Sequence, residues 1–227
     1  MTVAFVLTAA IALLNNVLHL TPAKVREHVV TAGVALAGLV GLVWLVEHHT
    51  HLLSGSPRTL IVAIATAGIG AIVTAALRYR PQLAGFFHDS RIAAMNAREF
   101  VAHTVLRIPV VSALAEEVLF RGVVWALLAS IGGTPFALIG SSVAFGLWHV
   151  VVSAHQAKRL DTPMARWIAG SVVATFAAGM GFGLIRLLTG SVWAPAVVHA
   201  TINLVGSIGA RVASRSQVPP RQLAAAA

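Results

Sequence analysis

The sequence predicts an all-α fold, a polytopic transmembrane helical bundle with about seven membrane-spanning helices, within a range of about six to eight. Of 227 residues, 58% are hydrophobic and only 10% are charged, and the mean hydropathy of +0.86 lies above the usual range of soluble domains. Apolar stretches recur, each about long enough to cross roughly 30 Å of hydrocarbon as a helix. They cover residues 3–20, 29–46, 60–77, 109–129, 135–152, 167–188 and 192–209.

The order of these stretches suggests three parts. Residues 1–99 are predicted to hold N-terminal transmembrane helices and, over 78–99, an interfacial amphipathic segment. Residues 100–210 form a predicted four-helix transmembrane core, which carries the intramembrane ionisable groups. The Ala-rich end, 211–227, is expected to be a disordered cytoplasmic tail. The connections are too short for a soluble domain, so any chemistry must lie in the membrane.

The distribution of basic residues predicts the orientation. The net charge is +9, and most Lys and Arg residues follow the first, third and fifth predicted helices or lie in the tail. By the positive-inside rule, the N-terminus lies outside and the C-terminus in the cytoplasm, and we expect the plasma (inner) membrane. This pattern indicates anionic lipid headgroups as partners and argues against nucleic acid. The chain has no cysteine, which excludes disulfides and a cysteine nucleophile.

Three charged residues lie within one apolar run. Glu116, Glu117 and Arg121 fall inside residues 108–131, although a charge at bilayer depth costs roughly 2.5–3.5 kcal/mol on insertion scales. Glu117 and Arg121 are spaced i,i+4, so they share one helix face and can form an ion pair. Such groups indicate a relay, a substrate path or a catalytic centre; a purely structural ion-pair cluster is the alternative.

Glu116 points about 100° away from Glu117 on the same helix, so we expect it to be unpaired. A carboxylate in an apolar site binds protons more readily and is suited to act as a general base toward water. Proline is tolerated best in the first turn of a helix, so the fourth crossing is predicted to begin at Pro109. That start places both glutamates about one-third of the way along the crossing.

Two later helices also carry polar groups at a comparable depth. His149 ends the segment Phe-Gly-Leu-Trp-His (145–149), and His199 and Asn203 are spaced i,i+4 in His-Ala-Thr-Ile-Asn (199–203). Each alone is as consistent with packing or an interhelical hydrogen bond. Together with Glu116 they predict a pocket that can deprotonate water and hold the oxyanion of an attacked amide. No serine shows a nucleophile elbow or a base partner.

These two segments and Glu-Glu-Val-Leu-Phe-Arg-Gly (116–122) resemble the three ordered motifs of the CPBP family. That family comprises CAAX prenyl endopeptidases and bacteriocin-processing or immunity (Abi) proteins. The resemblance covers about residues 100–210. It implies an intramembrane glutamate-dependent endopeptidase whose catalytic core is this segment, acting on a peptide or protein substrate, lipidated ones included.

Carried over by position, the resemblance implies that Glu116 and His149 activate water, that His199 and Asn203 complete the site, and that Glu117, Arg121 and Phe145 shape it. The family is often described as metalloproteases. No His-Glu-x-x-His helix is present, so we expect no required cofactor. A divalent metal such as zinc is the alternative, with Glu116, His149 and His199 as its first ligands.

Two other functions use similar residues. A proton-coupled transporter would also bury Glu, Arg and His, but no inverted repeat or pair of broken helices is visible. A non-catalytic immunity protein that binds a peptide or toxin is the second alternative.

Other polar and small residues suggest lesser roles. Asn15, Asn16 and His19 are expected to make interhelical hydrogen bonds, and His103 and Arg107 to line the cytoplasmic approach. The loop cluster of Glu47, His48, His49 and His51 is expected to be solvated or an incidental metal-binding turn. Gly33, Ala37, Gly41, Gly179 and Gly183 are predicted to mark close helix packing.

Overall fold

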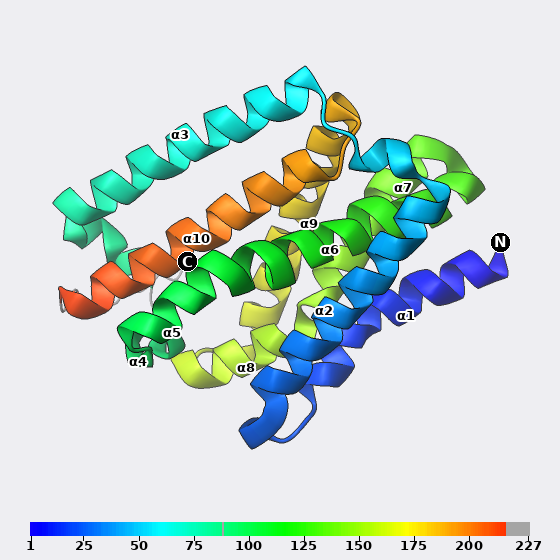
Figure 1. The fold of residues 1–227 in the computed structure, drawn as a ribbon. Coiled ribbons are helices and arrows are strands. Elements are labelled where there is room, and N and C mark those ends of the chain that lie inside the picture. The colour runs from blue at the N-terminus through cyan, green and yellow to red at the C-terminus, as the bar shows by residue number, and fades with distance from the viewer. Residues whose placement is uncertain (88, 217–227) are drawn as a thin grey trace.

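The computed structural model describes residues 1–87 and 89–216, and all regular structure in that part of the chain is helical. Six helical segments there are long and apolar enough to cross a membrane. This confirms an all-α polytopic bundle (Figure 1). Five segments are built on α1 (Thr2–His19), α2 (Ala23–His48), α3 (Pro57–Tyr79), α9 (Met164–Thr189) and α10 (Trp193–Arg215), and the sixth spans Ala97–Trp148.

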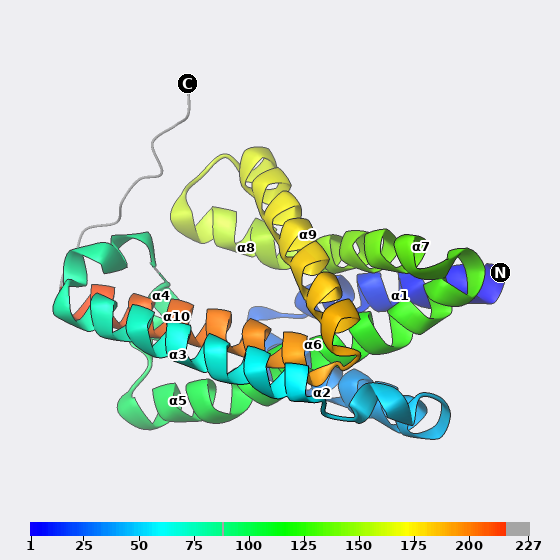
Figure 2. The ribbon, with the colours of Figure 1, turned by 90° about the horizontal axis from the view of Figure 1, so that it is seen from above.

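The sixth segment is broken at Gly133, where φ is 71° and ψ is −169°. Glycine has no Cβ to clash in this left-handed region. The two arms fold back on each other and pack closely. A Cβ built at Gly140 on the second arm would lie 2.7 Å from the side chain of Leu128 on the first. The predicted crossings 109–129 and 135–152 are therefore the two arms of one bent segment (Figure 2).

The first arm combines α5 (Ala97–Ala102), the π-helix η3 (His103–Leu114), α6 (Ala115–Glu117) and the π-helix η4 (Val118–Val124), and it continues into α7 (Trp125–Trp148). The predicted helix start at Pro109 is wrong, because Pro109 lies inside η3. The helix begins after Asn96. The Asn96 side chain accepts a hydrogen bond from Glu99 N at 3.0 Å, and the Glu99 side chain accepts one from Asn96 N at 2.8 Å. A wider π turn accommodates the missing N–H of proline within a transmembrane helix.

Hydrogen bonds join the connections at each end of the bundle. At one end, Trp193 Nε1 donates to Leu53 O at 2.7 Å and Val192 N to Leu52 O at 3.0 Å, which ties η1 (Thr50–Leu53) to the start of α10. At the other end, Arg211 Nη1 donates to Met95 O at 2.6 Å, beyond α4 (Ser90–Ala94). α10 continues to Arg215, and residues 217–227 of the predicted tail lie outside the described residues.

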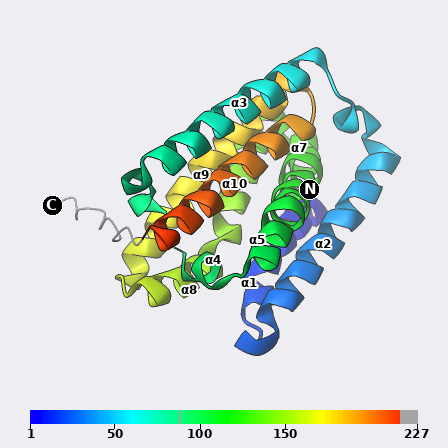
Figure 3. The same cartoon turned by 60° about the vertical axis from the view of Figure 1, so that its left-hand side comes forward.

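The first arm packs between α2 and α10, and α3 lies beside α10 (Figure 3). Close approach at glycines explains this packing, as predicted. A Cβ built at Gly33, Gly41, Gly179 or Gly183 would lie 2.5–3.1 Å from a side chain or backbone atom of a neighbouring helix. Gly38 makes a further contact that the sequence analysis did not identify: its Cβ would lie 2.5 Å from Ala115 Cβ and 2.9 Å from Ala115 Cα.

Gly38→Ala is expected to destabilise the bundle by about 1–3 kcal/mol, because the new methyl group would meet the backbone next to Glu116. Gly68→Ala is the matched control, since nothing lies within 4 Å of a Cβ there. Unfolding in mixed micelles measures both variants. Equal stability of Gly38→Ala and the wild type would contradict the packing described here.

Candidate active site

Glu117 lies at the centre of the bundle and is fully buried. Its Oε2 is 3.2 Å from Arg121 Nε, and its Oε1 accepts from Arg121 Nη1 at 3.3 Å. The guanidinium also donates to Gly179 O at 2.9 Å and stacks on the Phe145 ring, 4.5 Å from its centroid. The predicted i,i+4 ion pair is therefore present. The buried Arg121 guanidinium also contacts a backbone carbonyl and an aromatic ring.

His199 extends this buried network. Its Nδ1 lies 3.0 Å from Glu117 Oε1, and its ring stacks on Phe182 at 4.9 Å. An ionised Glu117 only accepts hydrogen bonds, so Nδ1 of His199 carries the hydrogen and Nε2 is the open ring nitrogen. Residue spacing predicted only the pair of Glu117 with Arg121, because it does not relate Glu117 to a histidine on α10.

Glu116 lines the cavity and approaches the other nitrogen of the same His199 ring. Its Oε2 lies 4.0 Å from His199 Nε2, and no described residue forms a hydrogen bond with that buried oxygen. A distance of 4.0 Å is too long for a direct hydrogen bond. Glu116 and His199 therefore present one carboxylate oxygen and one ring nitrogen side by side.

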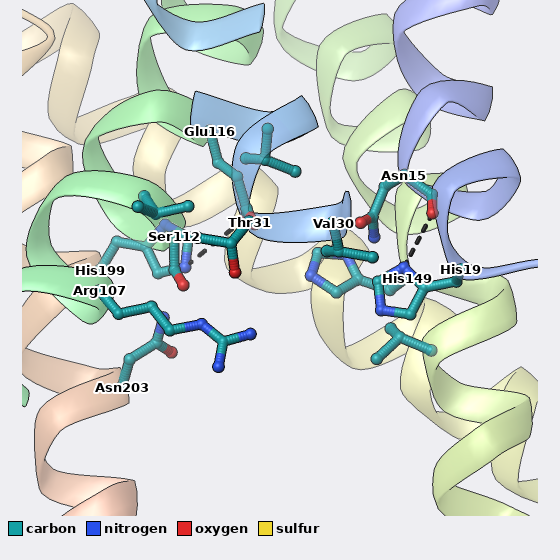
Figure 4. Close-up of a pocket in the computed structure, with 13 residues that line it drawn as sticks. Asn15, His19, Val30, Thr31, Arg107, Ser112, Glu116, His149, His199 and Asn203 are labelled. Carbon is teal, nitrogen blue, oxygen red and sulfur yellow. Dashed lines mark hydrogen bonds and ion pairs between the residues drawn. The ribbon is translucent and has the colours of Figure 1, made fainter. Parts of the chain in front are cut away.

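His149 stands at a break between two helices. Its φ of −97° and ψ of 0° separate α7 from α8 (Val150–Leu160). Its Nδ1 lies 2.8 Å from Phe145 O, and since a carbonyl can only accept, Nδ1 carries the hydrogen and Nε2 is open. Figure 4 shows His149 beside His19, across the pocket from His199 and Asn203.

The four predicted catalytic residues, Glu116, His149, His199 and Asn203, all line one cavity of about 230 Å³. Glu117, Arg121 and Phe145, which were predicted to shape the site, do not line it. They are buried behind it, so the structure divides the predicted residues into a lining and a supporting layer. Four further polar residues line the cavity: Asn15 and His19, which were expected only to make interhelical hydrogen bonds, and Thr31 and Ser112, which no sequence pattern indicated.

α1 holds the helix break at His149 in place. Asn15 Nδ2 donates to Trp148 O at 2.9 Å, and Asn16 Nδ2 donates to Leu147 O at 2.7 Å. Val151 N donates to Asn16 Oδ1 at 2.9 Å. These contacts satisfy backbone groups that the break leaves without helical partners. They confirm the interhelical hydrogen bonds predicted for the two asparagines, whereas His19 Nδ1 contacts Asn15 O within its own helix.

The site does not fit a three-ligand metal centre in this arrangement. Among residues 1–87 and 89–216, no group of three or more His, Asp or Glu side chains is placed to hold a metal ion. A catalytic zinc site requires three protein ligands around one point. His149 lies across the pocket from His199, so the predicted ligands Glu116, His149 and His199 do not surround a single position (Figure 4).

Of the remaining polar candidates, one lines the cavity and the others lie outside it. Arg107 lines the cavity as expected, but His103 does not. His48 and His49 pack on Trp44, with ring centroids 5.1 and 4.9 Å away, at the opposite end of α2 from its contacts with the site.

The family model of type II CAAX prenyl endopeptidase Rce1-like proteins matches residues 98–205. This match confirms the resemblance that the three motifs predicted, and it covers the helices that carry Glu116, His149 and His199. It supports an intramembrane endopeptidase of the CAAX-protease type in general. No curated protein and no solved structure matches the chain.

The two glutamates are expected to differ in their contribution to stability. Glu117→Gln leaves the buried Arg121 without its counter-ion and should cost about 3–5 kcal/mol. Glu116→Gln removes no ion pair with Arg121 and should change the free energy of unfolding by less than about 1 kcal/mol. Thermal unfolding in the same detergent tests both variants. Similar losses would contradict the division between lining and supporting residues.

Proposed function

Residues 98–205 match the Rce1-like endopeptidases, and on that premise we propose that this protein hydrolyses a peptide bond by glutamate-dependent activation of water within the membrane. The substrate is a protein or peptide, lipidated ones included. One observation carries the proposal: Glu116 opens into a cavity shared with His149, His199 and Asn203, while Glu117 is withdrawn behind it.

Glu116 is the general base in this mechanism. Its Oε2 has no described hydrogen-bond donor and lies 4.0 Å from the open nitrogen of His199, a separation that one water molecule can bridge. Glu116 takes a proton from that water as the water oxygen attacks the carbonyl carbon. The C–N bond then breaks, the proton passes to the leaving amine, and a carboxylate and an amine are released.

Asn203 is the neutral hydrogen-bond donor for the oxyanion. Both histidines keep their hydrogen on Nδ1, toward Phe145 O and Glu117, so neutral imidazole offers an acceptor at Nε2. His149 offers its acceptor on the opposite wall, where it can accept a hydrogen bond from the substrate or from a second water molecule. His199 becomes a donor only when protonated, and the Glu117 carboxylate at Nδ1 stabilises that imidazolium, as an aspartate does in a serine-protease triad.

The mechanism needs no metal. The described residues do not form a three-ligand set, which supports activation of water by Glu116 alone. The protein is further proposed to lie in the plasma membrane with its N-terminus outside. Arg26, Arg91, Arg107 and Arg159 meet around one cavity, which supports a common cytoplasmic end that contacts anionic lipids.

Glu116→Gln is expected to lower cleavage of a quenched peptide library, lipidated peptides included, by at least about 10²-fold, because glutamine cannot accept the proton. Glu47→Gln is the matched control at an exposed position, with 64% of the side chain accessible. Initial rates of purified protein in lipid give the comparison. Full activity of Glu116→Gln would refute the mechanism, and peptide binding without any cleavage would favour the immunity-protein alternative.

Chelation is expected to leave the cleavage rate within about twofold of the untreated enzyme, because no step runs through a bound cation. Phenanthroline and EDTA are compared with their non-chelating analogues, and the metal content of the purified protein is measured in parallel. Stoichiometric zinc together with activity restored only by added zinc would contradict a metal-independent site.

A further inference from the structure

His19 is the last residue of α1, and its ring lines the catalytic cavity beside His149 (Figure 4). It also lines a second cavity, of about 180 Å³. The two cavities adjoin, because both have His19, Val30, Arg107 and Val152 in their walls. A polypeptide that extends from the catalytic cavity into the second one therefore passes the His19 ring. The proposed mechanism gives His19 no role.

The ring of His19 presents an unused hydrogen-bond acceptor. Its Nδ1 lies 2.8 Å from Asn15 O. A carbonyl oxygen only accepts, so Nδ1 of the neutral ring carries the hydrogen and Nε2 is the acceptor. None of residues 1–87 and 89–216 donates a hydrogen bond to that nitrogen. His19 therefore matches His149, whose Nδ1 is bound to Phe145 O in the same way.

The charged groups nearby leave this nitrogen free. Arg26 Nε donates to a backbone carbonyl of the α1–α2 connection at 3.1 Å, and Arg107 pairs with Glu27. Burial lowers the pKa of His155, whose ring centroid is 6.1 Å from that of His19, and the charge of Arg26 lowers it further. These surroundings favour neutral imidazole rings, each of which accepts a hydrogen bond at one nitrogen.

We call His19 and His149 the acceptor wall, which faces His199 and Asn203 across the catalytic cavity (Figure 4). The planar peptide unit carries its C=O and its N–H on opposite sides. When the scissile carbonyl points toward Asn203, the N–H of the same unit therefore points toward the acceptor wall. In an extended chain alternate units repeat this orientation, about 6.5–7 Å apart, so a second N–H faces the same wall.

We propose that Nε2 of His19 accepts a hydrogen bond from a backbone N–H of the substrate, two peptide units from the scissile bond. The N–H of the scissile unit itself faces His149. This inference rests on the proposed function and narrows the substrate class to segments that bind in extended form with a secondary amide at that position. Proline and N-methylated residues have no N–H to offer there. They would leave the His19 acceptor unpaired, so such substrates bind more weakly.

The test is a double-mutant cycle between His19 and the peptide backbone. The probe is the library peptide that Glu116→Gln protein binds most tightly in phosphatidylcholine nanodiscs. Each amide of this peptide is replaced in turn by an ester, which removes one N–H. One ester should weaken binding about tenfold, and adding His19→Asn should reduce that loss to about twofold or less. Asparagine keeps an N–H for Asn15 O but places no acceptor where Nε2 lies.

Three further variants make the comparison specific. His149→Asn should be coupled to a different ester, two peptide units from the first, because both N–H groups lie on one edge of an extended chain. His19→Gln should restore the ester penalty, since its side-chain oxygen reaches the place of Nε2. His155→Asn is the matched control and should leave every ester penalty unchanged, because His155 lines only the second cavity. If His19→Asn does not fold, His19→Phe removes the acceptor and keeps a ring.

Ester penalties that are the same with and without the His19 acceptor overturn the proposal. So does an ester position that is coupled to His19 but is not two units from the one coupled to His149. Absence of binding by every library peptide overturns it as well.

The two proposals fail in different ways. Coupling between His19 and one ester, without cleavage by the wild type, leaves the acceptor wall intact and refutes the proposed protease. Cleavage by the wild type without such coupling refutes the role of His19 and leaves the protease.

Discussion

The buried carboxylate of Glu117 is the interaction on which the site depends. In a low-dielectric interior neither Glu117 nor Arg121 is tolerated alone, and each is stabilised by the other at 3.2 Å. The same carboxylate contacts His199 Nδ1, so one group joins the first arm of the bent segment to α10 and sets which nitrogen of His199 faces the cavity. Aromatic rings from α7 and α9 enclose the network. The support of the site and the core of the bundle are therefore the same set of contacts.

A second constraint is that backbone groups in a membrane need internal partners. The break at His149 and the bend at Gly133 both interrupt helical hydrogen bonding. The structure accommodates the two interruptions in different ways. Gly133 lies at the end of the bundle and needs only a residue without a Cβ. The break at His149 lies beside the cavity, where the amide groups of Asn15 and Asn16 replace the missing partners. α1 thus belongs to the site, although it lies outside the segment that matches the Rce1-like family.

These two supports leave a cavity whose walls differ in chemistry. Glu116, His199 and Asn203 come from the first arm and α10, and His149 comes from the α7–α8 junction. Such an arrangement suits a water molecule held between the Glu116 carboxylate and Nε2 of His199, with the amide of Asn203 in the same cavity. Four arginines, Arg26, Arg91, Arg107 and Arg159, line a smaller cavity that adjoins this one.

The sequence by itself determined the membrane class, the helical fold, the i,i+4 pair of Glu117 and Arg121, and four of the residues that line the cavity. These follow from hydropathy, helical periodicity and local motifs, which are properties of short segments. Only the tertiary structure decided that Glu117 contacts His199, that Asn15 and Asn16 hold the break at His149, and that the helix runs through Pro109 from Ala97. Those features depend on contacts between residues up to 135 positions apart, or on a backbone adjusted to its neighbours. Residue spacing along one helix contains no information about either.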